Sequence, residues 1–354
     1  MKNDPEIAAL SPEPQAETLP VAQGSADQLA HLQTLADKAR EYMRQANSAL
    51  TLDAYQSDWD HYRDWCISQD LAPLPADPAV IGLYLTACIT PAPGQAQGLA
   101  VSTIERRLSG LAWHFRQHGY ELDRQDPRVG KVLSGIRHVH WQPPAQKEPV
   151  LATDVMAMLD QLGRDLRGLR DRAILLVGFA GGMRRSEIVG LDVGPKQTDD
   201  GKGWGDVSAE GLLLHVYGKG RKLRQVEIGR GSSDQTCPVF AYETWLRLGR
   251  IAHGPVFRRI AQDGVTVMPD RLGGHHVARL VKATALAAGV GADAAEGERA
   301  AMFAGHSLRA GFGSSGIDEK HTQEQFGHAS VQMTRRYNRR RERFAVNMTK
   351  VAGL

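Results

Sequence analysis

The stretch "FGHASVQMTRRYNRRRER", residues 326–343, places one tyrosine, Tyr337, among six arginines and nine residues after a histidine, His328. A phenol has an ordinary pKa of about 10 and must lose its proton before it can attack as a nucleophile. Nearby positive charge lowers the cost of the phenolate. The stretch therefore has two interpretations, a solvated basic helix with an incidental aromatic residue or a phosphate-binding site in which Tyr337 reacts.

Three further segments in the same half of the chain carry groups suited to phosphate. Each has an ordinary explanation alone, because arginines at helix ends are usually on the surface and glycine-flanked lysines are common in turns. The pair in the third segment is three residues apart, so both side chains share a face if the segment is helical. The segments are "GGMRRSEIVGL" with Arg184 and Arg185, "YGKGRK" with Lys219, Arg221 and Lys222, and "GHSLRAGFG" with His306 and Arg309.

Composition and charge narrow the class of protein. The 354 residues are 42% hydrophobic and 23% charged, as in an ordinary globular protein. No apolar run of about 18 residues or more and no signal-peptide pattern is present, so neither a membrane span nor secretion is expected. Three widely spaced cysteines, Cys66, Cys88 and Cys237, favour a reduced compartment over a disulfide framework. Residues 1–29 contain one lysine and five acidic residues, a net charge of −4. The net charge of the whole chain is +3, so that of the remaining residues is +7, which favours a polyanionic partner.

The first half of the chain is predicted to be helical after a disordered arm over residues 1–29, which are rich in Pro, Ala, Glu and Gln. Ser102 and Glu105 have capping-box spacing and predict a helix start. Apolar residues at helical spacing predict two buried faces. These faces are Tyr55, Trp59, Tyr62 and Cys66, and Ile104, Leu108, Leu111 and Phe115.

The second half is predicted to be a separate domain. "WQPPAQKEP", residues 141–149, is typical of a semi-rigid linker because of its paired prolines. Thr153 is the expected N-cap of the next helix. "GLLLHVYG" and "LRQVEIG" predict a β-hairpin over residues 211–229 with a basic turn.

The order Arg, Lys, His-x-x-Arg, His, Tyr resembles the tyrosine recombinase or phage integrase family, to which Cre and the Xer recombinases belong. The motifs that carry this resemblance are "GMRRSEI", "GKGRK", "HSLRAGF" and "GHASVQMTRRY". The resemblance implies a mainly α fold, the DNA breaking-rejoining enzyme fold. An all-helical core-binding domain over residues 30–140 would precede a mostly helical catalytic domain over residues 150–354 with a small antiparallel β-sheet. Over residues 30–140 the likeness is one of helical pattern only.

The resemblance also implies a covalent mechanism. Tyr337 would attack a DNA phosphodiester to give a 3′-phosphotyrosine and a free 5′-hydroxyl, and another 5′-hydroxyl would then reseal the strand. Arg184 and Arg309 would bracket the non-bridging oxygens of the transition state, which suits forked and permanently charged guanidiniums. Because one phosphodiester is exchanged for another through a protein ester, no cofactor, metal or ATP is expected.

The remaining catalytic roles concern protons. His306 stands where the family places an acid/base group that takes the tyrosine proton. Lys219 would protonate the departing 5′-oxygen, with Lys222 as the alternative because the sequence does not fix the register of the turn. His328 would hydrogen-bond the phosphate or steady the nucleophile.

Other basic residues are candidates for contacts to the DNA backbone, which position the duplex without reading its sequence. The Arg106–Arg107 pair lies in the first domain, and the remainder surround the catalytic motifs. Glu187 follows Arg184 by three residues and is either a positioning group or an ordinary surface acid. The candidates for DNA contact are Arg106, Arg107, Arg185, Arg221, Lys222, Arg335, Arg336 and Arg339.

The leading hypothesis is therefore a cytoplasmic, nucleoid-associated site-specific recombinase of bacterial, phage or plasmid origin. It would act on double-stranded DNA with a specific site, as a homotetramer and away from membranes. The alternatives are a type IB topoisomerase-like enzyme and a non-catalytic DNA-binding protein on a recombinase scaffold. One departure from the family's pattern is that the connection from Arg309 to His328 is about four residues shorter than usual, about 6 Å of helix.

Overall fold

The computed structural model describes residues 26–45, 49–91, 94, 97–143, 146–218 and 222–338. The chain divides into two compact units, Met1–Pro144 and Ala145–Leu354. Within the described residues, no helix is both long and apolar enough to span a membrane. The three cysteines are free thiols, and each is buried.

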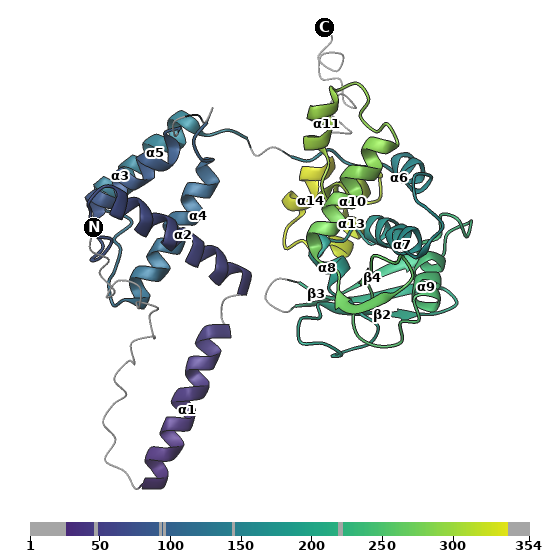
Figure 1. The fold of residues 1–354 in the computed structure, drawn as a ribbon, viewed down its shortest axis with the longest axis horizontal. Coiled ribbons are helices and arrows are strands. Elements are labelled where there is room, and N and C mark those ends of the chain that lie inside the picture. The colour runs from purple at the N-terminus through teal and green to yellow at the C-terminus, as the bar shows by residue number, and fades with distance from the viewer. Residues whose placement is uncertain are drawn as a thin grey trace. The chain divides into compact units, whose positions relative to one another are not determined.

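The first unit is all helical in its described residues (Figure 1). Its core lies where α2 packs on α4 and α3 packs on α5. The two faces predicted from helical spacing are buried, except that Tyr55 is only half-buried. The helices are α1 (Ala26–Gln45), α2 (Ala49–Ser68), α3 (Pro78–Ile89), α4 (Val101–Gln117) and α5 (Pro127–His140).

Two predicted helix caps are wrong. Helix α4 begins at Val101 after Ala100, so Ser102 lies inside the first turn and makes no capping bond. Helix α6 (Ala152–Leu159) likewise begins one residue before Thr153, and the Asp154 carboxylate accepts from the Leu151 amide over 2.8 Å. The capping preference of Ser102 alone would start α4 after Ser102. Val101 is buried, however, and its packing makes the helix begin two residues earlier.

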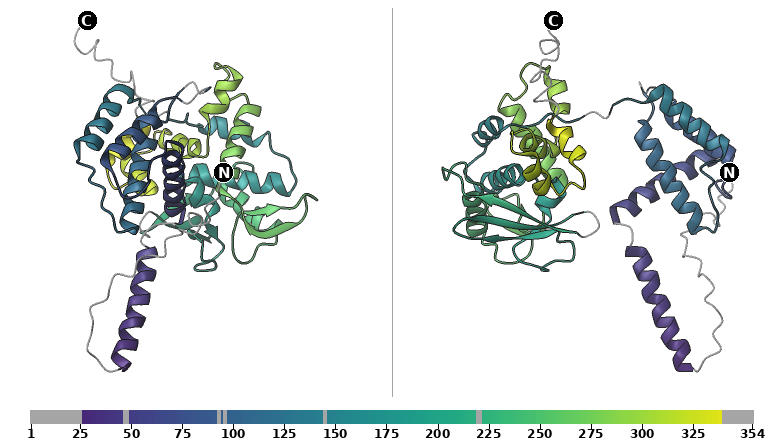
Figure 2. Two further views of the ribbon diagram at one scale, coloured as in Figure 1. Left: turned by 60° about the vertical axis from the view of Figure 1, so that its left-hand side comes forward. Right: turned by 180° about the vertical axis from the view of Figure 1, so that it is seen from behind.

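The second unit combines helices with two small sheets. Figures 1 and 2 show most of its helices gathered on one side of the larger sheet. Strand β3 alternates buried and half-buried residues, with Leu212, Leu214 and Val216 in the core. The elements after α6 are α7 (Leu166–Ala180), α8 (Arg185–Val189), β1 (Leu191–Asp192), β2 (Gly203–Val207), β3 (Gly211–Tyr217), β4 (Leu223–Gly229), α9 (Pro238–Leu248), β5 (Arg258–Ile260), β6 (Val267–Arg271), α10 (Gly274–Ala287), α11 (Glu296–Met302), α12 (His306–Gly313), α13 (Glu319–Phe326) and α14 (Val331–Asn338).

The predicted hairpin is present as β3 and β4, which pair antiparallel from Gly211 opposite Gly229 to Tyr217 opposite Leu223. The sheet is more complex than the antiparallel one expected. Its order is β1-β2-β3-β4, and β1 runs parallel to β2. A separate two-stranded sheet is formed by β5 and β6. Strands of two or three residues are too short to show an alternating pattern in the sequence.

The start of the second unit is bound to the helix that carries two predicted catalytic residues. The Val150 amide donates to the Ser307 carbonyl of α12 over 3.1 Å, and the Glu148 amide donates to the Met302 carbonyl over 2.9 Å. Gly311 permits this approach, because a Cβ atom there would lie 1.7 Å from the Val150 carbonyl oxygen. The end of the segment predicted as a linker is therefore bound to α11, and Val150 directly after it is bound to α12.

Candidate active site

Arg309 lies in α12 with no solvent-exposed surface. Its Nη1 donates to the Gly182 carbonyl over 2.6 Å, and its Nη2 donates to the Phe326 carbonyl over 2.8 Å. Nη2 also lies 3.1 Å from Nε2 of His328. The guanidinium carbon is 3.9 Å from the centroid of the Phe326 ring, within cation–π range. The planar group is thus fixed by segments far apart in the sequence.

Gly182 is required by this packing. Its φ of +54° lies in the left-handed region, which glycine adopts without the Cβ penalty. A Cβ atom would also lie 2.4 Å from Cε1 of Phe326. The glycine pair before Arg184 therefore lets the chain turn under Phe326 and present a carbonyl to Arg309.

His328 connects Arg309 to α14. Its Nδ1 is 2.9 Å from Oγ1 of Thr334. Because Arg309 can only donate to Nε2, we assign the neutral tautomer in which Nδ1–H donates to Thr334. Burial, followed by the charges of Arg309, Arg184 and Arg224, lowers the pKa of His328 to about 4. Tyr337 is three residues after Thr334 in α14, hence on the same side of the helix one turn later, and its side chain lies outside the described part of the chain.

Glu187 joins two arginines. The carboxylate is buried in α8, where Oε1 accepts from Nη1 of Arg184 over 2.7 Å and Oε2 accepts from the Arg184 amide over 2.9 Å. Nη2 of Arg224, on β4, donates to Oε2 over 2.7 Å. Burial raises the pKa of Glu187, but Arg224 and the bonds from Arg184 outweigh it, so the pKa is lowered. The ionised carboxylate holds Arg184 while leaving 41% of its side chain exposed.

His306 is the first residue of α12 and is exposed at the surface. Partial desolvation, followed by the charges of Arg309 and Arg184, lowers its pKa below the ordinary histidine value. His306 in turn contributes to the lowered pKa of His328. The charges of Arg184 and Arg309 thus act on both histidines, and Arg309 and His328 are in direct contact.

The short connection between Arg309 and His328 does not separate them. Helix α12 continues through Gly311 and ends at Gly313, and α13 follows after a five-residue turn over residues 314–318. The next residues return the chain to Arg309, as the hydrogen bonds to Phe326 and His328 show. Four residues fewer are therefore compatible with contact between these two positions.

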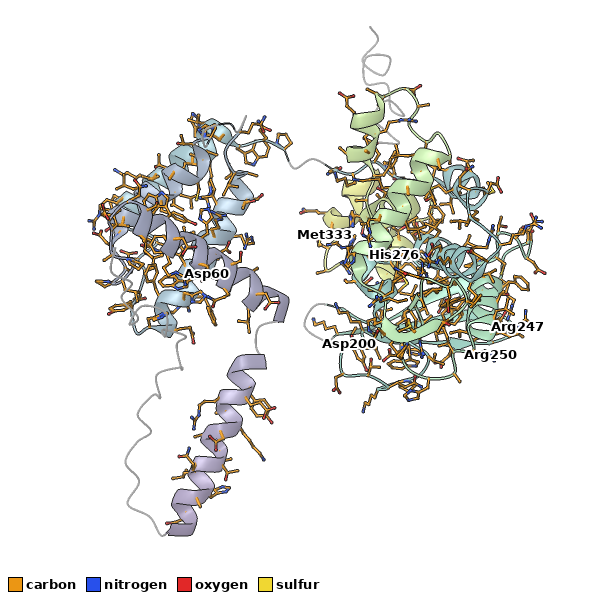
Figure 3. All side chains as sticks on the ribbon, in the orientation of Figure 1. Asp60, Asp200, Arg247, Arg250, His276 and Met333 are labelled. Atoms are coloured by element: carbon orange, nitrogen blue, oxygen red, sulfur yellow. The ribbon has the colours of Figure 1, made fainter. Side chains whose placement is uncertain are left out.

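The predicted general acid and several predicted DNA contacts lie outside the described residues, and others are at the surface. Lys219, Arg221 and Arg339 lie outside the described residues, as does the side chain of Arg336. Lys222 is exposed at the end of the hairpin turn, where its carbonyl accepts from the Gly218 amide over 2.9 Å. Arg185 is exposed beside Gly305, and Arg335 is exposed and paired with Glu319 over 2.8 Å. Met333, two residues before Arg335 on α14, is labelled in Figure 3.

The arginine pair of the first unit has two different environments. Arg106 is 46% exposed and forms an ion pair with the buried Asp58. Arg107 is 13% exposed, and its Nη1 lies 3.1 Å from the Tyr84 hydroxyl and 2.9 Å from Nδ1 of His61. Arg106 is therefore open to a ligand on its outer side, whereas Arg107 is largely surrounded by its own unit.

Sequence reasoning missed Arg224, Thr334 and Phe326 as parts of the site. Arg224 is separated from Glu187 by 37 residues, and only the strand-to-helix packing brings them together. A weak signal for Thr334 exists, since it precedes Tyr337 by one helical turn. In the residues that the structure describes, no group of three or more His, Cys, Asp or Glu side chains is arranged to hold a metal ion.

Comparison with known proteins identifies the class of this site. The model of the phage integrase family matches residues 150–343. An integrase/recombinase XerD homolog of Selenomonas ruminantium is 29% identical over 312 residues, which are 85% of this chain and 84% of the relative. Tyrosine recombinase XerC of Stutzerimonas stutzeri is 31% identical over 320 residues, covering 86% of this chain and 91% of the relative. This chain belongs to the phage integrase family.

As a family member, the chain is a tyrosine site-specific recombinase, as its motifs predicted. The fold agrees. A crystal structure of a lambda integrase dimer bound to a COC′ core site is similar with a TM-score of 0.51 at 13% identity, covering 86% of this chain and 94% of that one. The mainly helical fold class is therefore confirmed, with a mixed sheet in place of the antiparallel one.

Proposed function

We propose that this integrase-family chain cuts and rejoins double-stranded DNA at a specific site, with Tyr337 as the nucleophile. The observation that carries the assignment is the junction at His328, which bonds Arg309 on one side and the helix of Tyr337 on the other. A phosphate held by Arg309 would thereby lie near the helix that bears the phenol. Arg184, held by Glu187 but partly exposed, is the second guanidinium for the non-bridging oxygens.

His306 is proposed to accept the tyrosine proton. A general base must be unprotonated at the working pH, and the lowered pKa of His306 keeps its imidazole neutral near pH 7. His328 is also neutral there, but its Nε2 already accepts from Arg309 and its Nδ1 donates to Thr334. This arrangement favours a role for His328 in steadying the nucleophile helix over direct donation to the phosphate.

The departing 5′-oxygen needs a proton, which we assign to Lys219, with Lys222 as the alternative. Both belong to the turn between β3 and β4, and only Lys222 is among the described residues. The reaction conserves the number of phosphodiester and ester bonds, so residues of the chain suffice for it.

The first unit is proposed to be the core-binding domain and the second the catalytic domain. Among the predicted backbone contacts whose side chains the structure describes, the exposed ones are Arg106, Arg185, Lys222 and Arg335. Phosphate contacts of this kind should make binding salt-dependent. The lambda integrase tetramer has been solved on a Holliday junction, and we propose a homotetramer on DNA for this chain as well. Such an enzyme would act in the cytoplasm, where the DNA of a bacterium, phage or plasmid is accessible.

The direct test is to incubate the full chain with labelled fragments that tile the DNA flanking its own gene, and then to map strand breaks linked to protein. We expect one short site with protein on the 3′ side and a free 5′-hydroxyl. Tyr337→Phe should form no adduct but retain binding. Adducts at scattered positions, with relaxation of supercoils and no strand exchange, would favour a topoisomerase-like activity. Binding without any adduct by the wild type would favour a non-catalytic protein.

A further inference from the structure

Arg224 lies at the junction of three elements of the catalytic unit. From β4 its Nη2 donates to Oε2 of Glu187 in α8 over 2.7 Å, and its Nη1 donates to the Gln325 carbonyl at the end of α13 over 3.0 Å. The side chain is 12% exposed, and that of Glu187 is 4% exposed. Both Nη atoms of this guanidinium are thus bound to groups of the catalytic unit.

The segment that Arg224 holds is the one that leads to His328. Gln325 and Phe326 offer consecutive carbonyls, the first bound by Arg224 and the second by Arg309. Gly327, next in the chain, would place a Cβ atom 2.7 Å from Cδ of Arg224, so this backbone packs directly on the arginine stem. Arg224 and Arg309 therefore fix two consecutive residues of the segment that leads to His328.

The same side chain also acts on Arg184. Glu187 has one buried carboxylate, and each of its oxygens is committed, Oε1 to Arg184 and Oε2 to Arg224 and the Arg184 amide. Without Arg224, the carboxylate would be bonded to Arg184 alone and would lose the group that holds it from the side of β4. Its orientation, and hence that of the partly exposed Arg184 guanidinium, depends on the second arginine.

We propose that Arg224 is a positioning residue for strand cleavage, which sets the guanidinium of Arg184 against the imidazole of His328 by holding Glu187 and Gln325 together. This inference rests on the proposed function of the same site. We call Arg224, with its bonds to Glu187 and to the Gln325 carbonyl, the clamp. Because β4 begins at Leu223, directly after the hairpin turn, the clamp also connects the start of this strand to Arg184 through Glu187. Only a planar fork can serve Glu187 and the Gln325 carbonyl at once, which is why a lysine cannot replace it.

The experiment compares Arg224→Gln and Arg224→Lys with a matched control, Arg230→Gln, in the full chain. Arg230 follows β4 and pairs at the surface with Glu243 over 3.0 Å. The probe is a nicked duplex of the site mapped with the tiled fragments, at saturating concentration and well below the melting temperature. We expect the rate of adduct formation to fall about 100-fold in both Arg224 variants, as expected for reacting groups misplaced by about 1 Å. DNA affinity should stay within about twofold, and Arg230→Gln should cleave at the wild-type rate.

Two further measurements separate positioning from charge and from folding. Glu187→Gln combined with Arg224→Gln should be no slower than the slower single variant, because residues that act as a unit are not additive. The imidazole titration of His328, followed by NMR, should move to higher pH in Arg224→Gln, because a nearby positive charge is removed. A loss of rate in Arg224→Gln that Arg224→Lys restores would reduce the role to charge and overturn the proposal. So would equal losses in the Arg224 and Arg230 variants, or a defect confined to DNA affinity.

Failure of the proposed function would appear differently. If the wild type forms no adduct on any fragment, the assignment of catalysis fails, but the clamp is still tested by the imidazole signals of His306 and His328 in the DNA-free protein. Arg224→Lys should shift both signals if the fork positions the site, because Arg184 and the segment before His328 would move. Unchanged signals would rule the clamp out independently of DNA.

Discussion

Nη2 of Arg309 and Nε2 of His328 lie 3.1 Å apart inside the second unit, although a shortened connection separates the two residues in the chain. The same guanidinium holds two backbone carbonyls, and the imidazole reaches Thr334 on the helix of Tyr337. Both side chains are buried, so their hydrogen bonds contribute to the stability of the fold as well as to the site. Stability and cleavage should therefore respond together to changes here.

Replacing Arg309 by lysine should impair both properties. A lysine cannot satisfy the carbonyls of Gly182 and Phe326 together with His328, so buried acceptors are left unpaired. We expect a loss of about 2–4 kcal/mol in the free energy of unfolding and a fall of about 100-fold or more in adduct formation. Urea titration and single-turnover cleavage measure the two effects. Normal stability together with normal cleavage would contradict the described hydrogen bonding.

Thr334 should matter through its hydroxyl. Thr334→Val removes the acceptor for Nδ1–H of His328 while keeping the shape of the side chain, so a buried donor is left unpaired and the ring loses its bond to α14. We expect adduct formation to slow about 10-fold, by analogy with other groups that orient a histidine. Thr334→Ser, which keeps the hydroxyl, is the matched control and should retain most of the rate. Equal rates in the two variants would argue against a role for the Thr334 hydroxyl.

The second unit should lose stability in acid through His328. Its pKa is about 4 in the folded state, below the ordinary value of about 6.5, so the unfolded chain binds a proton first. The contribution is fully present above about pH 6.5 and is lost as the pH falls toward 4, to a total of about 3 kcal/mol. Chemical denaturation of wild type and His328→Gln between pH 7 and pH 4 measures it. The variant should show a smaller dependence on pH, and an identical dependence would contradict the burial of a neutral ring.

Gly311 should tolerate no side chain. Gly311→Ala would place a Cβ atom against the Val150 carbonyl, so the segment before α6 must move away from α12. We expect a loss of about 2 kcal/mol or more in the free energy of unfolding. Gly297→Ala in α11 is the control, because nothing lies within 4 Å of its added Cβ. That change should stabilise the unit by about 0.5–1 kcal/mol, and calorimetry of both variants tests the contrast.

Arg106 and Arg107 should separate DNA affinity from stability. Arg106→Gln should weaken DNA binding and reduce the salt slope by about one phosphate contact, because its side chain is exposed. Arg107→Gln should instead lower the stability of the first unit by about 2 kcal/mol, since Tyr84 and Asp58 lose a shared partner and keep only His61 and Arg106, respectively. Fluorescence anisotropy at several salt concentrations, with thermal melting, checks both. An unchanged salt slope in Arg106→Gln would remove it from the interface.

Features that depend on a local residue pattern or on the order of the motifs could be predicted from the sequence. Alternating residues fixed the hairpin of β3 and β4, and helical spacing identified Ile104, Leu108, Leu111 and Phe115 as core. What it did not show depends on contacts between distant segments. The bonds of Arg224 to Glu187 and to Gln325, and the start of α4 before Ser102, are set by packing that a local pattern does not contain.

Glu187 shows why such contacts decide function. From sequence, a glutamate three residues after an arginine on a short helix fits a surface acid and a positioning group equally well. Burial to 3% exposure and two arginine partners resolve the choice in favour of positioning. The sequence shows that residue 187 is a glutamate, but its burial and its two arginine partners are visible only in the structure.

The anchoring of the chain ahead of α6 has a practical consequence for preparing the catalytic half alone. Besides the Glu148 and Val150 amides, the ammonium of Lys147 donates to the Ala301 carbonyl. An expression fragment that begins at residue 150, where the match to the family starts, would lack Lys147 and Glu148. The carbonyls of Ala301 and Met302 at the end of α11 would then lose these two hydrogen bonds. A fragment beginning at residue 145 should be the better-behaved reagent, with a higher melting temperature than its trimmed counterpart.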